Sequence, residues 1–209
     1  RQWLAAALAG IGALRLGSYI AGRVAHHGED PRYARFRADW GAAYARNMLF
    51  VILPQAPAAA ILAISVRIAA TAPAPGLHPR DLIGAALLAI AIGGEALADR
   101  QIKRFKADPA NKGKVCDAGL WGWSRHPNYF FEWLGWLAYP LIGFDPGRPV
   151  TWLSFAAPVV MYLLLTRISG VPPLEEAMLR SRGDAYRAYQ ARVSAFFPFP
   201  PKPAQSPSA

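Results

Sequence analysis

The chain has 209 residues, of which 54% are hydrophobic and only 17% are charged. A soluble domain carries about a quarter of its residues as Asp, Glu, Lys or Arg, so this composition argues against a soluble protein and excludes a disordered one. The net charge of +10 would suggest nucleic-acid binding in a soluble chain, whereas the single cysteine, Cys116, excludes a disulfide framework.

Five apolar segments approach the roughly 20 residues that cross a bilayer as a helix. They are 3–20, 47–66, 82–98, 129–144 and 150–166. In a soluble protein, the rest of the chain would be too short to bury five such apolar helices. We therefore expect an all-α, polytopic integral membrane protein with about five transmembrane helices, cytoplasmic helical loops and a cytoplasmic tail.

The chain shows no internal repeat, so we assign residues 1–198 to a single membrane-embedded domain. Residues 199–209 are rich in Pro and Ser, and we expect them to form a frayed tail. Because the sequence starts at Arg1 and runs directly into an apolar segment, we also expect further helices upstream in a longer protein.

The basic residues are distributed unevenly between the two ends of the predicted spans. Of the 23 Lys and Arg residues, 18 lie in segments 23–46, 100–125 and 167–202, and three lie in the loops on the opposite side. An excess of Lys and Arg marks the cytoplasmic face, so we expect these segments and the C-terminus to be cytoplasmic. This distribution explains the net charge without nucleic acid, and the partners we expect are membrane lipids.

Ionisable residues inside predicted spans are functional candidates because they are costly in a bilayer. Arg15 and Tyr19 lie on one helical face, and Glu95, Asp99 and Lys103 lie on one face across the end of the third span. Such a stripe could line a cavity. Snorkelling at a helix end is the alternative, and it is the better explanation of the basic residues taken alone.

Gln55 follows Pro54 in the middle of the second predicted span. We expect it to be a buried amide that needs hydrogen-bond partners. A bond to another helix and a place in a ligand pocket are both open interpretations.

The motif 124–129, Ser-Arg-His-Pro-Asn-Tyr, stands directly before the fourth predicted span. Pro127 favours the first turn of a helix, and the free N–H groups there would face the same side as Arg125. A helix N-terminus beside a guanidinium is a good anion site, and Asn128 and Tyr129 could hold a planar heterocycle. The alternative is a capped helix in a positively charged loop.

The stretch 174–189 predicts a helix, a break at Gly183 and a second short helix. Glu175 and Glu176 near the helix start suit its dipole. Tyr186 and Tyr189, spaced i, i+3, could stack on a ligand or anchor an interfacial helix.

Four sequence blocks resemble the steroid 5-alpha-reductase C-terminal-type membrane proteins, especially their uncharacterised bacterial branch. The blocks are 14–16 with 28–33, 95–106, 124–129 with Glu132, and 169–175 with Tyr189 and 197–198. The resemblance covers nearly the whole chain. It implies a multi-pass protein of the bacterial inner membrane that binds NADPH in a cytoplasm-facing cavity. Hydride would pass to a conjugated C=C bond of a steroid-like or other lipid enone that enters from the bilayer.

The resemblance also implies roles for individual residues. By this likeness, the cofactor-contacting residues would be Asp99, Lys106, Asn128, Tyr129, Glu132 and Glu175. From the charged and aromatic residues around them, we also expect Glu95, Lys103, Arg104, Arg125, His126 and Tyr189 to bind the cofactor. From their positions in the predicted spans, and not from the likeness, we expect Arg15, Tyr19 and Gln55 to line the substrate pocket. We expect Tyr19 and Glu132 to be catalytic, with Tyr19 donating to the substrate oxygen. No metal and no obligatory protein partner are expected.

Two features leave the function open. Steroid reductases carry a Gln-Glu pair on an upstream helix, and this chain has none. Isoprenylcysteine carboxyl methyltransferases have a similar Arg-His-Pro-x-Tyr turn and paired glutamates like Glu175 and Glu176, and they bind S-adenosylmethionine. A methyltransferase is therefore the alternative, and a non-catalytic lipid-binding or scaffold protein is a third class.

Overall fold

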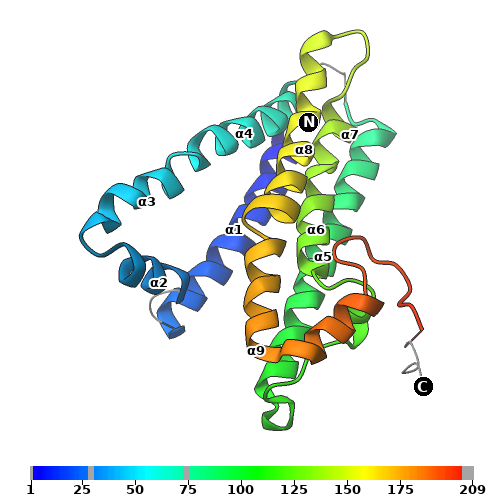
Figure 1. The fold of residues 1–209 in the computed structure, drawn as a ribbon. Helices are drawn as coiled ribbons and strands as arrows, with labels where there is room; N and C mark the ends of the chain where they lie inside the picture. Colours follow the sequence, from blue (N-terminus) through cyan, green and yellow to red (C-terminus); the bar gives the residue numbers. More distant parts are fainter. Residues whose placement is uncertain (1, 28–30, 73–75, 204–209) are drawn as a thin grey trace.

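The computed structural model describes residues 2–27, 31–72 and 76–203, and every regular element in these ranges is a helix. Four described segments are long and apolar enough to cross a membrane: Gln2–Gly22, Tyr33–Thr71, Pro79–Ala107 and Pro149–Arg192. Figure 1 shows α1 (Gln2–His27) and α5 (Pro79–Ala107) running along the length of the molecule, whereas α8 (Ala156–Leu163) is a short helix in the C-terminal half. The predicted all-α, polytopic membrane fold is confirmed.

The predicted span 129–144 is instead two short helices, α6 (Pro127–Trp136) and α7 (Ala138–Gly143). Pro140 has no N–H to donate to the carbonyl of Trp136, so the helix is interrupted at Leu137. Neither helix alone has the roughly 20 residues of a span. The described residues therefore contain four candidate spans rather than the five expected, and α6 and α7 pack along α5.

The second predicted span is also interrupted. It comprises α3 (Tyr44–Ile52) and α4 (Gln55–Thr71), which meet at Pro54. In Figure 1, α2 (Pro31–Trp40) and α3 lie to one side, whereas α4 returns to α7. Gln55 is exposed, and its Nε2 donates to the carbonyl oxygen of Val51 at 3.1 Å. The expectation of a buried pocket amide was wrong, because Gln55 satisfies a carbonyl that the helix break leaves without its usual partner.

The C-terminal half ends in α9 (Val171–Arg192), which follows α8 through a π-helical turn at Leu164–Ile168. Gly183 has φ +51° within α9, so the predicted break at this residue is confirmed. The tail then returns to the loop before α6. The backbone N–H of Phe199 donates to the carbonyl of Trp123 at 3.1 Å. The expected fraying was therefore wrong at the start of residues 199–209, and residues 204–209 lie outside the described part.

The helices α5, α6 and α7 pack closely and form the core of the molecule. On α5, a Cβ added at Gly84 would collide with Ile142 of α7, and one added at Gly94 would collide with the ring of Phe131. These two glycines therefore let large apolar side chains of the neighbouring helices lie directly on α5. The resulting core of α5, α6 and α7 supports α1 and α4 at its sides.

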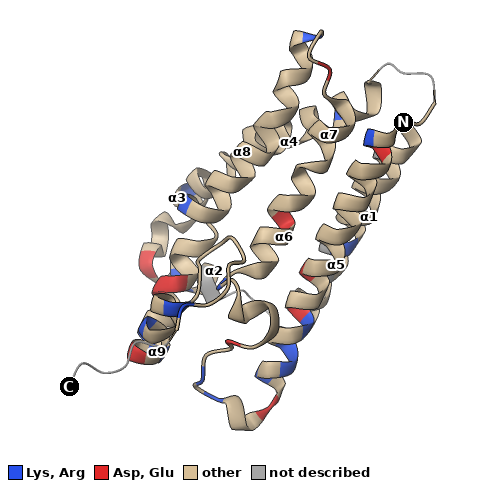
Figure 2. Cartoon of the chain, turned by 90° about the vertical axis from the view of Figure 1, so that its right-hand side faces the viewer, with Lys and Arg blue, Asp and Glu red and all other residues tan. Residues whose placement is uncertain are grey.

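The basic side chains gather at one end of the molecule. Figure 2 shows most Lys and Arg residues where α5 ends and α9 lies, and few at the opposite end. The chain runs toward this end in α1, α5 and α8 and away from it in α4 and in α6 with α7 (Figure 1), which brings the basic segments together. The grouping of charge expected from the sequence is thus present in the fold.

Candidate functional site

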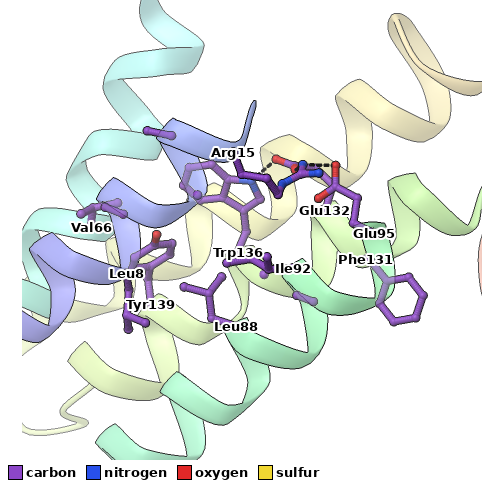
Figure 3. Close-up of a pocket in the computed structure, with 15 residues that line it drawn as sticks. Leu8, Arg15, Val66, Leu88, Ile92, Glu95, Phe131, Glu132, Trp136 and Tyr139 are labelled. Carbon is purple, nitrogen blue, oxygen red and sulfur yellow. Dashed lines mark hydrogen bonds and ion pairs between the residues drawn. The ribbon is translucent and has the colours of Figure 1, made fainter. Parts of the chain in front are cut away.

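A cavity of about 250 Å³ lies between α1 and the core helices α4 to α7 (Figure 3). It is lined by Leu8, Ala9, Gly12, Ala13, Arg15, Val66, Leu88, Ala91, Ile92, Glu95, Phe131, Glu132, Gly135, Trp136 and Tyr139. Small residues of α1 leave room for it, and most of its wall is apolar. The cavity is therefore suited to a lipophilic molecule.

One end of the cavity is strongly polar. The guanidinium of Arg15 on α1 forms an ion pair with Glu95 on α5, and lies 3.8 Å from Asp99 and 3.9 Å from Glu132 of α6. Figure 3 shows Arg15 beside Glu95 and Glu132. Trp136 Nε1 donates to Glu132 Oε1 at 3.1 Å. In the described part of the chain, three carboxylates thus surround one guanidinium, so the cluster carries an excess of negative charge when all are ionised.

The cluster extends toward the basic end of α5. The side chain of Asn128 lies near Asp99, which brings the first turn of α6 close to α5. Lys103, Arg104 and Lys106 follow on α5, where all three are exposed. The helical rise of about 1.5 Å per residue places Lys106 about 10 Å beyond Asp99 along the axis.

The structure therefore brings together five of the residues predicted for the site: Arg15, Glu95, Asp99, Asn128 and Glu132. Arg15 and Glu95 were predicted from their positions inside apolar segments, and Glu132 from its place one turn after Asn128. Tyr19 lies in α1, but its side chain is outside the described part of the structure.

Arg125 has a different use from the one expected. Its Nε donates to Glu175 Oε1 at 2.6 Å, and its Nη1 donates to the carbonyls of Gln190 at 3.1 Å and Val193 at 2.6 Å. The expected open guanidinium fork for phosphate is thus wrong, because these donors hold α9 and the chain that follows it. Glu175 is engaged in the same network and also lies 3.3 Å from His126 Nε2.

Tyr189 is likewise part of the core. Its side chain is 3% exposed, and its hydroxyl donates to the carbonyl of Trp121 at 2.5 Å. Tyr186, one turn earlier, is 2% exposed. Stacking of Tyr189 on a cofactor was therefore a wrong expectation. His126 is also buried and stacks against Tyr129, with 5.6 Å between ring centroids.

The sequence reasoning missed the residues that form the deeper wall of the cavity, above all Trp136 and Tyr139. A helical pattern could have found them, because Glu132, Trp136 and Tyr139 are spaced i, i+4, i+7. On α5, Leu88, Ile92 and Glu95 repeat this spacing. A charged residue thus lies in line with apolar cavity residues on α5, and likewise on α6 with its continuation into α7.

Comparisons with known proteins place the chain in a family without assigning an activity. A family described as "protein of unknown function (DUF1295)" matches residues 1–193. An uncharacterised protein of the fission yeast Schizosaccharomyces pombe is 38% identical over 98 residues, which cover 46% of this chain and 27% of that protein. No solved structure matches the chain. Because the family match extends over nearly all of its length, the chain belongs to the DUF1295 family of proteins of unknown function.

Proposed function

We propose that this protein is a membrane oxidoreductase that transfers a hydride from NADPH to a conjugated C=C bond of a lipophilic enone. The observation that carries the proposal is that Glu132, at the polar end of an apolar cavity, shares the Arg15 cluster with Asp99, which has Asn128 beside it. The sequence blocks that contain these residues resemble the steroid 5-alpha-reductase-type proteins, in which such positions contact the cofactor. We extend that likeness to this chain as part of the proposal.

The residues present suit NADPH chemically. The Asn128 amide and the carboxylates of Asp99 and Glu132 offer donors and acceptors for a nicotinamide carboxamide. The exposed Lys103, Arg104 and Lys106 provide positive charge for phosphates, and they take over the role that Arg125 cannot fill. NADPH supplies the hydride when bound, and the protein supplies orientation and electrostatics.

The proposal includes an orientation in the membrane. The end of the molecule that carries most Lys and Arg residues (Figure 2) would face the cytoplasm of a bacterium, as the distribution of positive charge favours. The phosphate-binding residues would then meet NADPH from the cytoplasm. The lipophilic substrate would enter the cavity from the bilayer.

One observation favours the methyltransferase alternative. The cluster around Arg15 has three carboxylates and one guanidinium among the described residues, and this excess of negative charge suits the sulfonium of S-adenosylmethionine. Arg125 is engaged with Glu175, which removes one expected phosphate ligand. The two functions therefore differ in the charge of the cofactor that the site must accept.

The role of Asn128 provides a direct test with a matched control. Asn128→Ala should weaken NADPH binding about two- to tenfold, the equivalent of one hydrogen bond. Asn47→Ala, on α3 and outside the cavity wall, should leave NADPH affinity unchanged. Calorimetric titration of the purified protein in detergent measures both. Equal affinities for Asn128→Ala and the parent protein would contradict the proposed cofactor site.

A further inference from the structure

A tyrosine hydroxyl in the cavity wall has no partner among the described residues. Tyr139 is 6% exposed as a whole and lines the cavity, and its hydroxyl makes no hydrogen bond with any residue that the structure describes. The hydroxyl oxygen itself is not fully buried, so it is accessible from the cavity. The hydroxyl of Tyr189, by contrast, donates to a carbonyl inside the core. The Tyr139 hydroxyl is therefore available to donate a hydrogen bond to a ligand.

The surroundings of Tyr139 define the chemistry of that ligand. Figure 3 shows its ring between Leu8 and Trp136, in the apolar part of the cavity. At the polar end, Arg15 is already paired with Glu95, and Trp136 donates to Glu132. Tyr139 is thus the neutral donor in the described wall that makes no hydrogen bond within the protein.

Charge decides between an anionic and a neutral ligand. The carboxylates of Glu95 and Glu132 both line the cavity, whereas Arg15 is the one cationic group in the described wall. A fatty-acid carboxylate would meet like charges there, and this repulsion is strong in a medium of low polarity. A neutral carbonyl avoids that repulsion and can accept the hydrogen bond of a phenol.

Size limits the ligand further. The cavity of about 250 Å³ is slightly smaller than the 300–1,000 Å³ of pockets that enclose drug-sized molecules. It can hold one ring with a short chain, or the head of a longer lipid that continues between the helices. A bulky fused-ring molecule would have to extend out of the cavity.

We propose that the cavity binds a compact lipophilic ketone, or the ketone-bearing end of a longer lipid, and that the Tyr139 hydroxyl donates a hydrogen bond to the ketone oxygen. The assignment of this cavity as the substrate site rests on the proposed reductase function. Binding of a ketone to the cavity does not require the cofactor, so ketone binding can be tested separately.

The test compares two labelled probes on protein in lipid nanodiscs without cofactor. The probes are an octyl-substituted cyclohexenone and the matched octylcyclohexene, which has no oxygen, and empty nanodiscs give the background. Tyr139→Phe should weaken binding of the cyclohexenone about two- to tenfold, as expected for one neutral hydrogen bond. Binding of the octylcyclohexene should not change.

A second pair of variants tests the location. A Cβ at Gly12 would enter open space, and Gly12 lines the cavity, so Gly12→Phe should fill it and weaken binding of both probes. Gly17 lies on the same helix, is exposed and has equally open space, but it does not line the cavity. Gly17→Phe should therefore leave binding of both probes unchanged.

Two results would overturn the proposal. One is an equal effect of Tyr139→Phe on the two probes, including no effect on either, in protein that remains monodisperse. The other is unchanged binding of both probes to Gly12→Phe. Because no cofactor is present, either result would leave the NADPH titration as a separate test. A failure of NADPH binding would likewise leave the ketone site standing.

Discussion

Arg15 on α1 forms an ion pair with Glu95 on α5, a residue 80 positions further along the chain. The side chains of this pair are only 20% and 13% exposed. Most described residues of α1 are exposed, so this pair is a principal polar link between α1 and the core. The same pair forms the polar end of the cavity, which makes it important for both stability and binding.

Breaking this pair should destabilise the protein more than removing both charges. Arg15→Leu should lower the free energy of unfolding by about 1–3 kcal/mol, because it leaves the largely buried Glu95 without its donor. The double variant Arg15→Leu with Glu95→Gln should recover part of that loss, because no unpaired charge remains. Thermal unfolding in one detergent compares the three proteins. A double variant less stable than Arg15→Leu would contradict this account of the pair.

The positions of charged residues within apolar segments were enough to predict part of the site. Arg15, Glu95 and Glu132 are costly in a bilayer, so each was a candidate from sequence alone, and their convergence is observed. The role of Arg125 could not be predicted, because its acceptors are carbonyls of Gln190 and Val193. Such contacts depend on where the chain returns after α9, which no local pattern specifies.

The span count shows a similar limit. The apolar run 129–144 has the composition of a transmembrane helix, but Pro140 divides it into α6 and α7. Tyr139, next to this proline, was not considered as a site residue because tyrosine is common in apolar segments. Its importance comes from a missing partner, and only the structure shows partners.

Glu175 and Glu176 are neighbours in sequence with very different environments. Glu175 accepts hydrogen bonds from Arg125 and Gln190, whereas Glu176 pairs with Arg180 on the exposed side of α9. Glu175→Gln should lower the free energy of unfolding by about 1.5–3 kcal/mol, the range for bonds to charged groups. Glu176→Gln should change it by less than about 0.5 kcal/mol, as for exposed pairs within a helix.

Limited digestion with trypsin would report the same difference locally. Loosening of the Arg125 network should expose the chain after α9, so Glu175→Gln should be cleaved faster at Arg192 than the parent protein. Glu176→Gln should be cleaved at the parent rate. Equal cleavage of the two variants would show that Glu175 does not hold this segment.

The two buried tyrosines should respond differently to loss of the hydroxyl. Tyr189→Phe removes a hydrogen bond to the carbonyl of Trp121 and should destabilise the protein by about 1 kcal/mol. Tyr139→Phe removes a hydroxyl without a described partner, so stability in the absence of ligand should stay the same or rise. Thermal unfolding measures both. A loss for Tyr139→Phe as large as that for Tyr189→Phe would show that its hydroxyl has a structural role.

Cys116 should react only slowly with thiol-labelling reagents in the folded protein. It is 7% exposed, and burial raises the pKa of its thiol above the ordinary value, so the reactive thiolate is scarcer at neutral pH. A maleimide should therefore react with Cys116 slowly in the folded protein and rapidly after denaturation. Fast labelling of the folded protein would contradict the buried position.

Because Cys116 reacts slowly, the orientation of the protein in the membrane can be tested with single cysteines introduced into the otherwise natural chain. Lys112 and Pro146 are both exposed, Lys112 in the connection after α5 and Pro146 in the connection after α7. The end of α5 and the end of α7 lie at opposite ends of the molecule (Figure 1). In intact spheroplasts, Pro146→Cys should react with an impermeant maleimide, and Lys112→Cys should react only after the membrane is permeabilised. The reverse pattern would place the basic end outside the cytoplasm and would separate the proposed site from its supply of NADPH.

The central claim is that the site accepts a dinucleotide phosphate rather than a sulfonium. The most direct measurement is a side-by-side calorimetric titration of the purified protein with NADPH, NADH and S-adenosylmethionine. The proposed function predicts saturable binding of NADPH, weaker binding of NADH because Lys103, Arg104 and Lys106 would lose a phosphate contact, and no saturable binding of S-adenosylmethionine. Saturable binding of S-adenosylmethionine without binding of NADPH would contradict the reductase and favour the methyltransferase.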